Sequence, residues 1–299
     1  MQKIDFKKNI TNMTIEKISP YLNLSDLPDE VNISTVTLTA AFDTSLDLEN
    51  IGKYMKLTQN RIVYIKYGRS SGVVRTLIPI KQKAKRKKKK NKVAFYNQVT
   101  LKIISSYKDK NKPTNVKLFK NGSLQLTGCV SVENFIEVLT IVCEELCKVR
   151  AVIDLPKMNK MVIKPFAGSP QNLDVSKVKN IKIRMINSNF DIGFKINRDQ
   201  LYELLLSESI DCRYEPCVHA CVNLKYYYNN KEKVSIFVFE SGAVIITGAK
   251  TQEQITGAYE FITKKLVDNY QTIVKTDIDD IIKQNGGLKK MMMDLLEKN

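Results

Sequence analysis

Four side chains of the kind that bind zinc lie close together in the chain: Cys212, Cys217, His219 and Cys221. Thiolate sulfur and imidazole nitrogen are ligands that zinc prefers. However, C-x4-C-x-H-x-C is not a usual zinc-knuckle spacing, and positions 217, 219 and 221 would crowd along one face of a strand. We therefore expect no metal site and no cofactor here.

Catalysis has little support in the sequence. His219 is the only histidine, and the chain has neither a phosphate-cradling G-x-x-x-x-G-K-[ST] motif nor a paired-ligand metal motif. Asp279 and Asp280, adjacent in the C-terminal tail, fit a solvated helix face. We predict a protein that is not an enzyme and that works by binding.

The clearest binding chemistry is a basic run at positions 81–92, in which nine residues are basic and none is acidic. The chain carries a net charge of +17, and removing the run leaves 17 − 9 = +8. Polyanions are the natural partners of such a chain, nucleic acid first and an anionic membrane surface second, and charge alone does not choose between them. The run fits a phosphate-contacting loop, a nuclear import signal or a solvated loop. The candidate phosphate contacts are Lys85, Arg86, Lys87, Lys88, Lys89 and Lys90.

A second pattern places the same side chains twice. FKNGSLQLTG begins at Phe119 and FESGAVIITG begins at Phe239, and both fit F-x-x-G-x-x-x-x-T-G with an offset of 239 − 119 = 120 residues. Each copy carries a threonine, Thr127 or Thr247. An aromatic residue in a strand is more often buried than functional, so the motif by itself leaves core packing and binding both open.

The elements around the two motifs also repeat in order. Alternating β-branched stretches predict strands, and apolar residues at helical spacing behind capping residues predict helices. The first repeat predicts a strand at 33–42, a helix at 45–55, strands at 62–68 and 99–107, a hairpin at 116–128, and a helix capped by Ser131. The second predicts a strand at 181–190, a helix capped by Asn197, a strand at 221–228, a hairpin at 234–248, and a helix capped by Thr251.

This order predicts an α+β fold, most simply one continuous antiparallel sheet with helices on one face. The other face would stay open to a flat ligand. We divide the chain into an N-terminal extension (1–30), a first repeat (31–150, with the basic insertion 81–92), a linker (151–178), a second repeat (179–271) and a helical tail (272–299).

The cellular compartment of the protein is inferred from three features that the sequence lacks. No window has the ~18 consecutive apolar residues that a membrane helix needs. The N-terminal MQKIDFKKNITNM lacks the apolar core of a secretory signal. The six cysteines do not suggest a disulfide framework, which belongs to small secreted chains. We expect an intracellular protein that does not bind a membrane.

At this point the residues resemble a known family. SGAVIITGAK at 241–250, with Phe239 before it, is similar to the last hairpin of the TATA-box-binding protein family. YEPCVHACVNLKY from Tyr214 and SLDLENIG from Ser45 resemble two further stretches of that family. The resemblance covers about residues 31–150 and 179–270, and it marks the chain as a divergent member of the kind that a large DNA virus encodes.

The resemblance implies a pseudo-two-fold saddle with helices on its convex face, whose concave sheet binds the DNA minor groove. Aromatic side chains wedge between base steps and kink the duplex, so that lost stacking is exchanged for contact. The hairpin wedges correspond to Phe119 and Phe239, and the wedges of the other two loops correspond to Tyr96 and His219.

The same resemblance assigns the rest of the DNA-facing surface. It implies the side chains of Lys117, Gln125, Thr127, Phe237, Ile245 and Thr247, together with phosphate contacts from Lys102 and Lys225. The family's groove-reading asparagines are not evident, because the alignment meets Thr35 or Thr37 in one half and Ile183 or Arg184 in the other. Lys117 and Gln125 stand where the family has apolar residues, which makes the two halves chemically unequal.

Two functions from different classes follow. The first is an initiation factor that binds and bends A·T-rich promoter DNA and recruits a IIB-type factor and RNA polymerase, with Tyr214, Glu215 and Pro216 on the partner surface. The second is a basic scaffold that recruits transcription components through its helices and binds DNA weakly and nonspecifically. Either would act in the host nucleus or a cytoplasmic viral factory, or be packaged in the virion.

Overall fold

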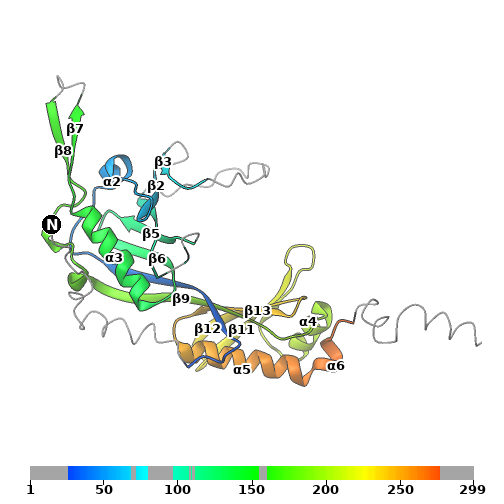
Figure 1. The fold of residues 1–299 in the computed structure, drawn as a ribbon. Helices are drawn as coiled ribbons and strands as arrows, with labels where there is room; N and C mark the ends of the chain where they lie inside the picture. Colours follow the sequence, from blue (N-terminus) through cyan, green and yellow to red (C-terminus); the bar gives the residue numbers. More distant parts are fainter. Residues whose placement is uncertain are drawn as a thin grey trace, which may run out of the picture. The chain divides into compact units, whose positions relative to one another are not determined.

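The computed structural model describes residues 26–68, 72–79, 97–107, 109, 112–154 and 160–276 (Figure 1). These residues divide into two compact units: unit 1 contains Ile33–Ile186, and unit 2 contains Leu27–Asn32 and the chain from Asn187. The basic insertion, Tyr96 and most of the predicted helical tail lie outside the described residues.

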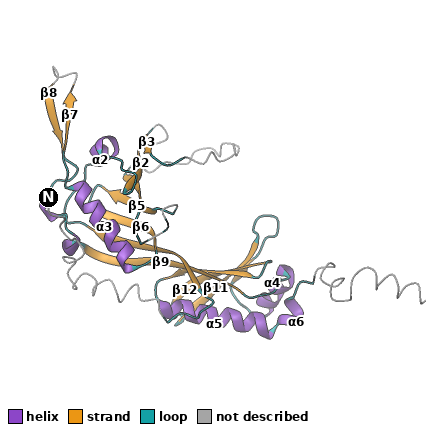
Figure 2. Ribbon diagram, viewed as in Figure 1, coloured by secondary structure: helices purple, strands orange, loops and turns teal. Residues whose placement is uncertain are grey.

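Unit 1 consists of a sheet with helices on one face (Figure 2). Its elements are β1 (Asn32–Ala41), α2 (Leu48–Tyr54), β2 (Ile62–Tyr67), β3 (Val73–Thr76), β4 (Gln98–Ile103), β5 (Thr114–Phe119), β6 (Ser123–Cys129), α3 (Val132–Leu146), β7 (Arg150–Asp154) and β8 (Lys160–Lys164). The two short 3-10 turns are η3 (Pro170–Asn172) and η4 (Val175–Lys177).

Unit 2 repeats this plan after the strand that the two units share. Its elements are β9 (Lys179–Asp191), α4 (Arg198–Ser207), β10 (Cys212–Arg213), β11 (Cys221–Tyr228), β12 (Glu232–Phe239), β13 (Ala243–Ala249), α5 (Gln252–Asp268) and α6 (Tyr270–Ile273). Helix α5 packs along β11, β12 and β13, on the face opposite to the one that stays open.

The strands follow one hydrogen-bonded order, β10-β11-β12-β13-β9-β1-β6-β5-β4-β2-β3, and the pairings within the hairpins and meanders are antiparallel. This confirms the predicted fold class, in which two repeats contribute to one antiparallel sheet and helices cover one of its faces. The segment predicted as a linker contains a separate two-stranded sheet, β7-β8.

Side-chain alternation explains why one face of the sheet is core and the other is not. In β5 and β6 the buried positions are Val116, Leu118, Leu124 and Leu126, while the residues between them are half-buried. Helix α3 covers the buried positions with the residues that its spacing predicted, Phe135, Val138, Leu139, Val142 and Leu146. Burial of this apolar surface is the main stabilising contribution to each unit.

Matching caps begin the two long helices. The side chain of Ser131 accepts a hydrogen bond from Asn134 N, and that of Thr251 accepts one from Gln254 N. The amide side chains then reach back, since Asn134 Oδ1 accepts from Val130 N and Gln254 Oε1 accepts from Lys250 N. Each cap satisfies backbone donors that the first helical turn leaves free, as the sequence predicted.

The two hairpin turns depend on glycine. Gly122 and Gly242 have φ angles of +82° and +94°. A Cβ atom on Gly122 would lie 2.2 Å from Thr44 O, and one on Gly242 would lie 2.4 Å from Phe194 O. Both conformation and space therefore exclude a side chain at these turns.

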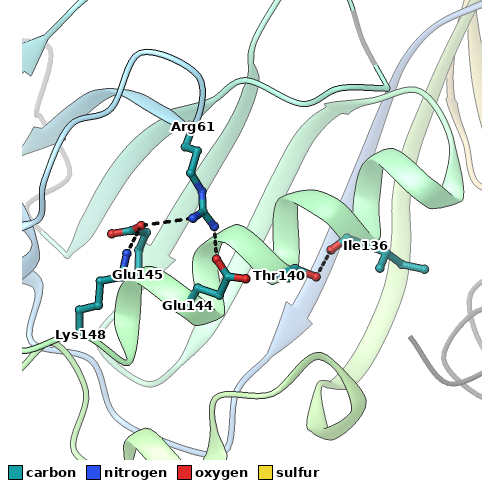
Figure 3. Close-up of polar contacts among 6 residues, drawn as sticks. All are labelled: Arg61, Ile136, Thr140, Glu144, Glu145 and Lys148. Carbon is teal, nitrogen blue, oxygen red and sulfur yellow. Dashed lines mark hydrogen bonds and ion pairs between the residues drawn. The ribbon is translucent and has the colours of Figure 1, made fainter. Parts of the chain in front are cut away.

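A charged cluster joins the end of α3 to the start of β2 (Figure 3). Arg61 forms an ion pair with Glu144, and its Nη1 atom lies 3.9 Å from Glu145 Oε1. Glu145 is buried and also binds Lys148. The buried carboxylate is thus compensated by two cations, one of which, Arg61, ties the end of α3 to the residue before β2. Among the described residues, no helix is long and apolar enough to cross a membrane.

Candidate nucleic-acid interface

The open face of unit 1 carries a polar row formed by four strands. Lys117 lies opposite Gln125 on β6 and opposite Thr100 on β4. Gln125 lies opposite Thr39 on β1. Directly opposed residues point to the same face of a sheet, so these side chains form one continuous row.

A second row of the same face runs beside the first. Thr127 lies opposite Thr37 and Asn115, and Asn115 lies opposite Lys102. Lys102 Nζ sits 4.9 Å from the centre of the Tyr64 ring, a cation–π contact. Partial burial raises the pKa of Tyr64. The lysine is thereby held on the sheet with its charge toward the open face.

The open face of unit 2 has the same layout with different chemistry. Phe237 lies opposite Ile245 and Asn223. In the next row Ser235 lies opposite Thr247 and Lys225. Lys225 Nζ donates a hydrogen bond of 2.7 Å to Ser235 Oγ, so this lysine is also fixed along the face.

The strand register makes the two faces residue-by-residue equivalents. Lys102 pairs with Asn115 and Lys225 pairs with Ser235, and 235 − 115 gives the offset of 120 found in the motif. The structure therefore places each lysine that the resemblance assigned in the same row as the threonine of its repeat: Lys102 with Thr127, and Lys225 with Thr247. It also makes Lys117 the counterpart of Phe237 and Gln125 the counterpart of Ile245, so unit 1 is polar where unit 2 is apolar.

Phe119 and Phe239 occupy equivalent ends of this surface. Phe119 is opposite Gln98, Phe239 is opposite Cys221, and each lies three residues before its turn glycine. Both rings are half-buried, whereas the neighbouring Leu118 and Val238 are fully buried. Neither phenylalanine belongs to the core, so both are available at the tips of the open face.

The structure adds one polar residue that sequence reasoning missed, Asn187, and gives Arg184 a partner. Asn187 Oδ1 lies 2.5 Å from Thr247 Oγ1, and Arg184 Nε donates to Thr39 Oγ1 at 3.0 Å. The sequence alignment had reached Ile183 or Arg184 and had found no asparagine. The helix caps could have revealed it, because Asp47 and Asn197 cap equivalent helices 150 residues apart, and the same offset relates Thr37 to Asn187.

The loop between β10 and β11 holds its assigned residues in different settings. Tyr214 is buried, with its ring centre 5.9 Å from that of Tyr202 and 5.6 Å from the Arg198 guanidinium. Glu215 and Pro216 are exposed and carry what remains of the predicted partner surface. His219 is exposed in the loop before β11 begins, and its backbone N–H donates to Glu215 O at 2.8 Å.

The cysteines near this loop do not converge. Within the part of the chain that the structure describes, no group of three or more His, Cys, Asp or Glu residues is arranged to hold a metal ion. Partial burial raises the pKa of both Cys212 and Cys221. Tyr96 and the basic residues 85–90 lie outside the described residues, so their assignments stay predictions.

Comparison with known proteins agrees with this geometry. Residues 180–269, which make up the second repeat, match the family model described as "Transcription factor TFIID (or TATA-binding protein, TBP)". A "TATA-box-binding protein-like" protein of Acanthamoeba polyphaga mimivirus is 36% identical over 257 residues, covering 81% of this chain and 66% of the relative. A TATA-box-binding protein of Tetrahymena thermophila is 34% identical over 93 residues, covering 31% of this chain and 35% of that protein.

The chain therefore spans just under two thirds of the mimivirus relative and about a third of the Tetrahymena one. Among solved structures, Methanococcus jannaschii TBP is similar at 18% identity with a TM-score of 0.47, covering 80% of this chain and 99% of that one.

Proposed function

We propose that this chain, a divergent viral-type member of the TATA-box-binding protein family, is a transcription factor that binds duplex DNA with the open face of its sheet. It would enter the minor groove, widen it and bend the duplex. The proposed action is binding and deformation, with no chemical step. It would also present the bent DNA to a IIB-type factor and RNA polymerase.

One observation carries the proposal: the two units present matching open faces. Each face places a phenylalanine at its tip, Phe119 or Phe239, and a lysine in the row of its threonine, Lys102 or Lys225. Half-exposed strands that carry an aromatic residue at one end suit the minor groove, because an apolar side chain can insert between base steps and unstack them. The lysines of the same strands can bind the flanking phosphates.

The open faces of the two units differ in polarity, which supports binding to DNA in one preferred orientation. The minor groove of A·T pairs presents only acceptors, whereas G·C pairs add the guanine N2 amino donor. Ile245 and Phe237 offer this donor no partner, while Gln125 offers an amide oxygen. We propose that unit 2 occupies the strictly A·T half of the site and that unit 1 tolerates G·C.

A second candidate function is favoured by the same inequality. Lys117 and Gln125 make the face of unit 1 polar, and His219 lies in a loop rather than on a strand. A scaffold that recruits transcription components through its helices, with weak nonspecific DNA affinity, would also fit these residues. Glu215 and Pro216 are the exposed residues of the predicted partner surface in either case.

Bending and affinity, measured together against salt, separate the two functions. Short A·T-rich and G·C-rich duplexes labelled at both ends would report affinity by anisotropy and bend angle by energy transfer. Preferential A·T binding with a large bend supports the initiation factor. Affinity that disappears above physiological salt, without a bend, supports the scaffold, since nonspecific binding is dominated by counterion release.

Phe239→Ala tests the wedge directly. We expect the bend at that end of the site to be lost while residual affinity remains, because the ring supplies unstacking rather than charge. Phe261→Ala is the matched control: Phe261 lies on α5, with its ring centre 5.3 Å from that of Tyr226 on the covered side of unit 2. An unchanged bend in Phe239→Ala would reject the wedge assignment.

A further inference from the structure

The β7-β8 hairpin is the one part of the described fold that forms a sheet of its own. Figure 1 shows it standing away from the sheet and helices of unit 1. Its register pairs Ala151 with Ile163 and Arg150 with Lys164. An isolated two-stranded hairpin is marginally stable in water, so this element has most to gain from a partner.

One face of the hairpin is apolar and open. Met161 and Ile163 are 74% and 66% exposed, and Val149, at the base of the hairpin, is 53% exposed. Met161 and Ile163 are two residues apart on β8 and therefore share a face, which Ala151 joins from β7. Clustered exposed apolar side chains of this kind mark interaction sites.

The opposite face of the hairpin is positive at its base, because residues next to Ala151 and Ile163 point away from the apolar face. Arg150 and Lys164 are directly opposed across the two strands. Lys164 acts on Glu49, but the pKa of that carboxyl is lowered chiefly by its hydrogen bond to Lys53, with which it is already paired. Among the residues that the structure describes, neither Arg150 nor Lys164 forms an ion pair, so both cations at the base of the hairpin can meet an acidic partner.

We propose that the β7-β8 hairpin is a docking surface for a protein partner whose contact region is apolar and acidic, bound as an extended segment along the hairpin. Both outer edges of this two-stranded sheet present unpaired backbone donors and acceptors, which an extended segment can use. Alternate side chains of that segment would cover Met161 and Ile163, and its carboxylates would meet Arg150 and Lys164.

Other occupants fit less well. DNA phosphates would bind Arg150 and Lys164 but would make no favourable contact with Met161 and Ile163. DNA binding therefore does not explain the exposed apolar face. A second copy of the chain would place like charges against each other across a symmetric contact, in a protein of net charge +17. The surface is distinct from the open face of the sheet and does not depend on the DNA-binding proposal.

A peptide titration on the full chain tests the proposal. The probe is a short fluorescent peptide in which valine and glutamate alternate, followed by anisotropy at physiological salt. We expect binding that falls by about tenfold or more in Met161→Ser/Ile163→Ser and again in Arg150→Gln/Lys164→Gln. A peptide with lysine in place of glutamate should not bind.

The matched control is Val74→Ser/Leu77→Ser. Val74 and Leu77 are 45% and 50% exposed on and after β3, in the same unit but away from the hairpin. This variant should keep full peptide affinity, which separates the hairpin from general attraction of an acidic peptide to a basic chain.

Three outcomes would overturn the proposal. Peptide binding that is absent, or equal in the hairpin and control variants, removes the docking surface. Loss of DNA affinity in Met161→Ser/Ile163→Ser, with no change in peptide binding, assigns the hairpin to DNA. Loss of a dimer in sedimentation by the same variant assigns it to self-association. A loss of peptide binding in the hairpin variants with unchanged DNA bending supports the docking surface independently of the proposed function.

Discussion

At the scale of single residues, the repeated motif separates into two kinds of position. The glycines at both turns are backbone requirements, since their φ angles are positive and a Cβ atom would meet carbonyl oxygens. The phenylalanine and threonine of each copy instead lie on the open face, outside the buried core of the sheet. Packing explains the glycines, and binding is the better explanation for the side chains that recur with them.

Gly242→Ala should destabilise unit 2. The new Cβ atom would lie 2.4 Å from Phe194 O in addition to adopting a strained φ, and we expect a loss of more than about 2 kcal/mol in the free energy of unfolding. Gly193→Ala is the control, because Gly193 also has a positive φ, +85°, but has no neighbour within 4 Å. Equal losses in urea denaturation of the two variants would contradict the role of the close contact.

Thiol reactivity should divide the cysteines by burial. Burial raises the pKa of Cys143 to about 12, so very little of it is thiolate near pH 8, while Cys217 is exposed in the loop before β11. Iodoacetamide followed by peptide mass spectrometry should label Cys217 quickly and Cys143 only after unfolding. Comparable labelling of both in the folded chain would show that α3 opens without global unfolding.

At the scale of elements, a charged cluster ties the turn of the β12-β13 hairpin to α4 and to the segment after α6. Glu240, next to Phe239, binds Lys275 after α6 at 2.6 Å and Arg198 of α4 at 2.8 Å. The hydrogen bond to Lys275 is the largest cause of the lowered pKa of Glu240. The cluster therefore holds the strand end that carries the proposed wedge.

Glu240→Gln should lower stability in a pH-dependent way. A carboxyl whose folded-state pKa lies below its ordinary value of 4.5 contributes stability above that value and loses it as the pH falls through the folded pKa. We expect a loss of the order of 0.5–1 kcal/mol near pH 7, typical of exposed ion pairs, and a smaller loss near pH 3. Thermal unfolding at both pH values measures it.

Glu203→Gln is the control for this measurement. Glu203 is an exposed carboxylate of α4 that forms no ion pair within the described part of the chain. Its replacement should leave the unfolding free energy nearly unchanged at both pH values. A Glu240→Gln loss that is as large at low pH as at pH 7 would point to packing rather than charge.

At the scale of the whole molecule, the two units share a plan but not a surface. The row Thr39, Gln125, Lys117 and Thr100 in unit 1 is polar throughout, whereas unit 2 places Ile245 and Phe237 at the equivalent of its centre. The repeated sequence pattern accounts for the common strand register of the two units. The residues that differ between them lie on the open face, where side chains do not pack in the core. Two unequal faces are what the proposed oriented binding to DNA would require.

Lys117→Phe/Gln125→Ile makes unit 1 resemble unit 2. We expect stronger discrimination against G·C pairs in one half of the site, by about 1–3 kcal/mol per substituted pair, because the acceptor for guanine N2 is lost. If Lys117 also meets a phosphate, the salt slope should fall by about 0.9. Competition binding with duplexes substituted in either half measures both effects.

The reverse variant, Phe237→Lys/Ile245→Gln, is the matched counterpart. It should relax discrimination in the other half of the site and leave the first half unchanged. If neither variant alters the preference for A·T over G·C pairs, the proposal that the two faces read the groove unequally is wrong.

The sequence by itself determined the repeat, the strands and helices within it, their caps and the alternation of core and open positions. These features depend on local spacing, because a strand alternates with period two and a capping residue acts within one helical turn. Lys102 and Lys225 were assigned through the family resemblance and not from local spacing.

Only the tertiary structure placed Asn187 beside Thr247, buried Tyr214 against α4 and exposed Met161 on a hairpin of its own. Each of these depends on which distant segments meet. A shift of one residue in strand pairing moves a side chain to the other face of the sheet. The local sequence pattern does not determine which residues of two distant strands are paired.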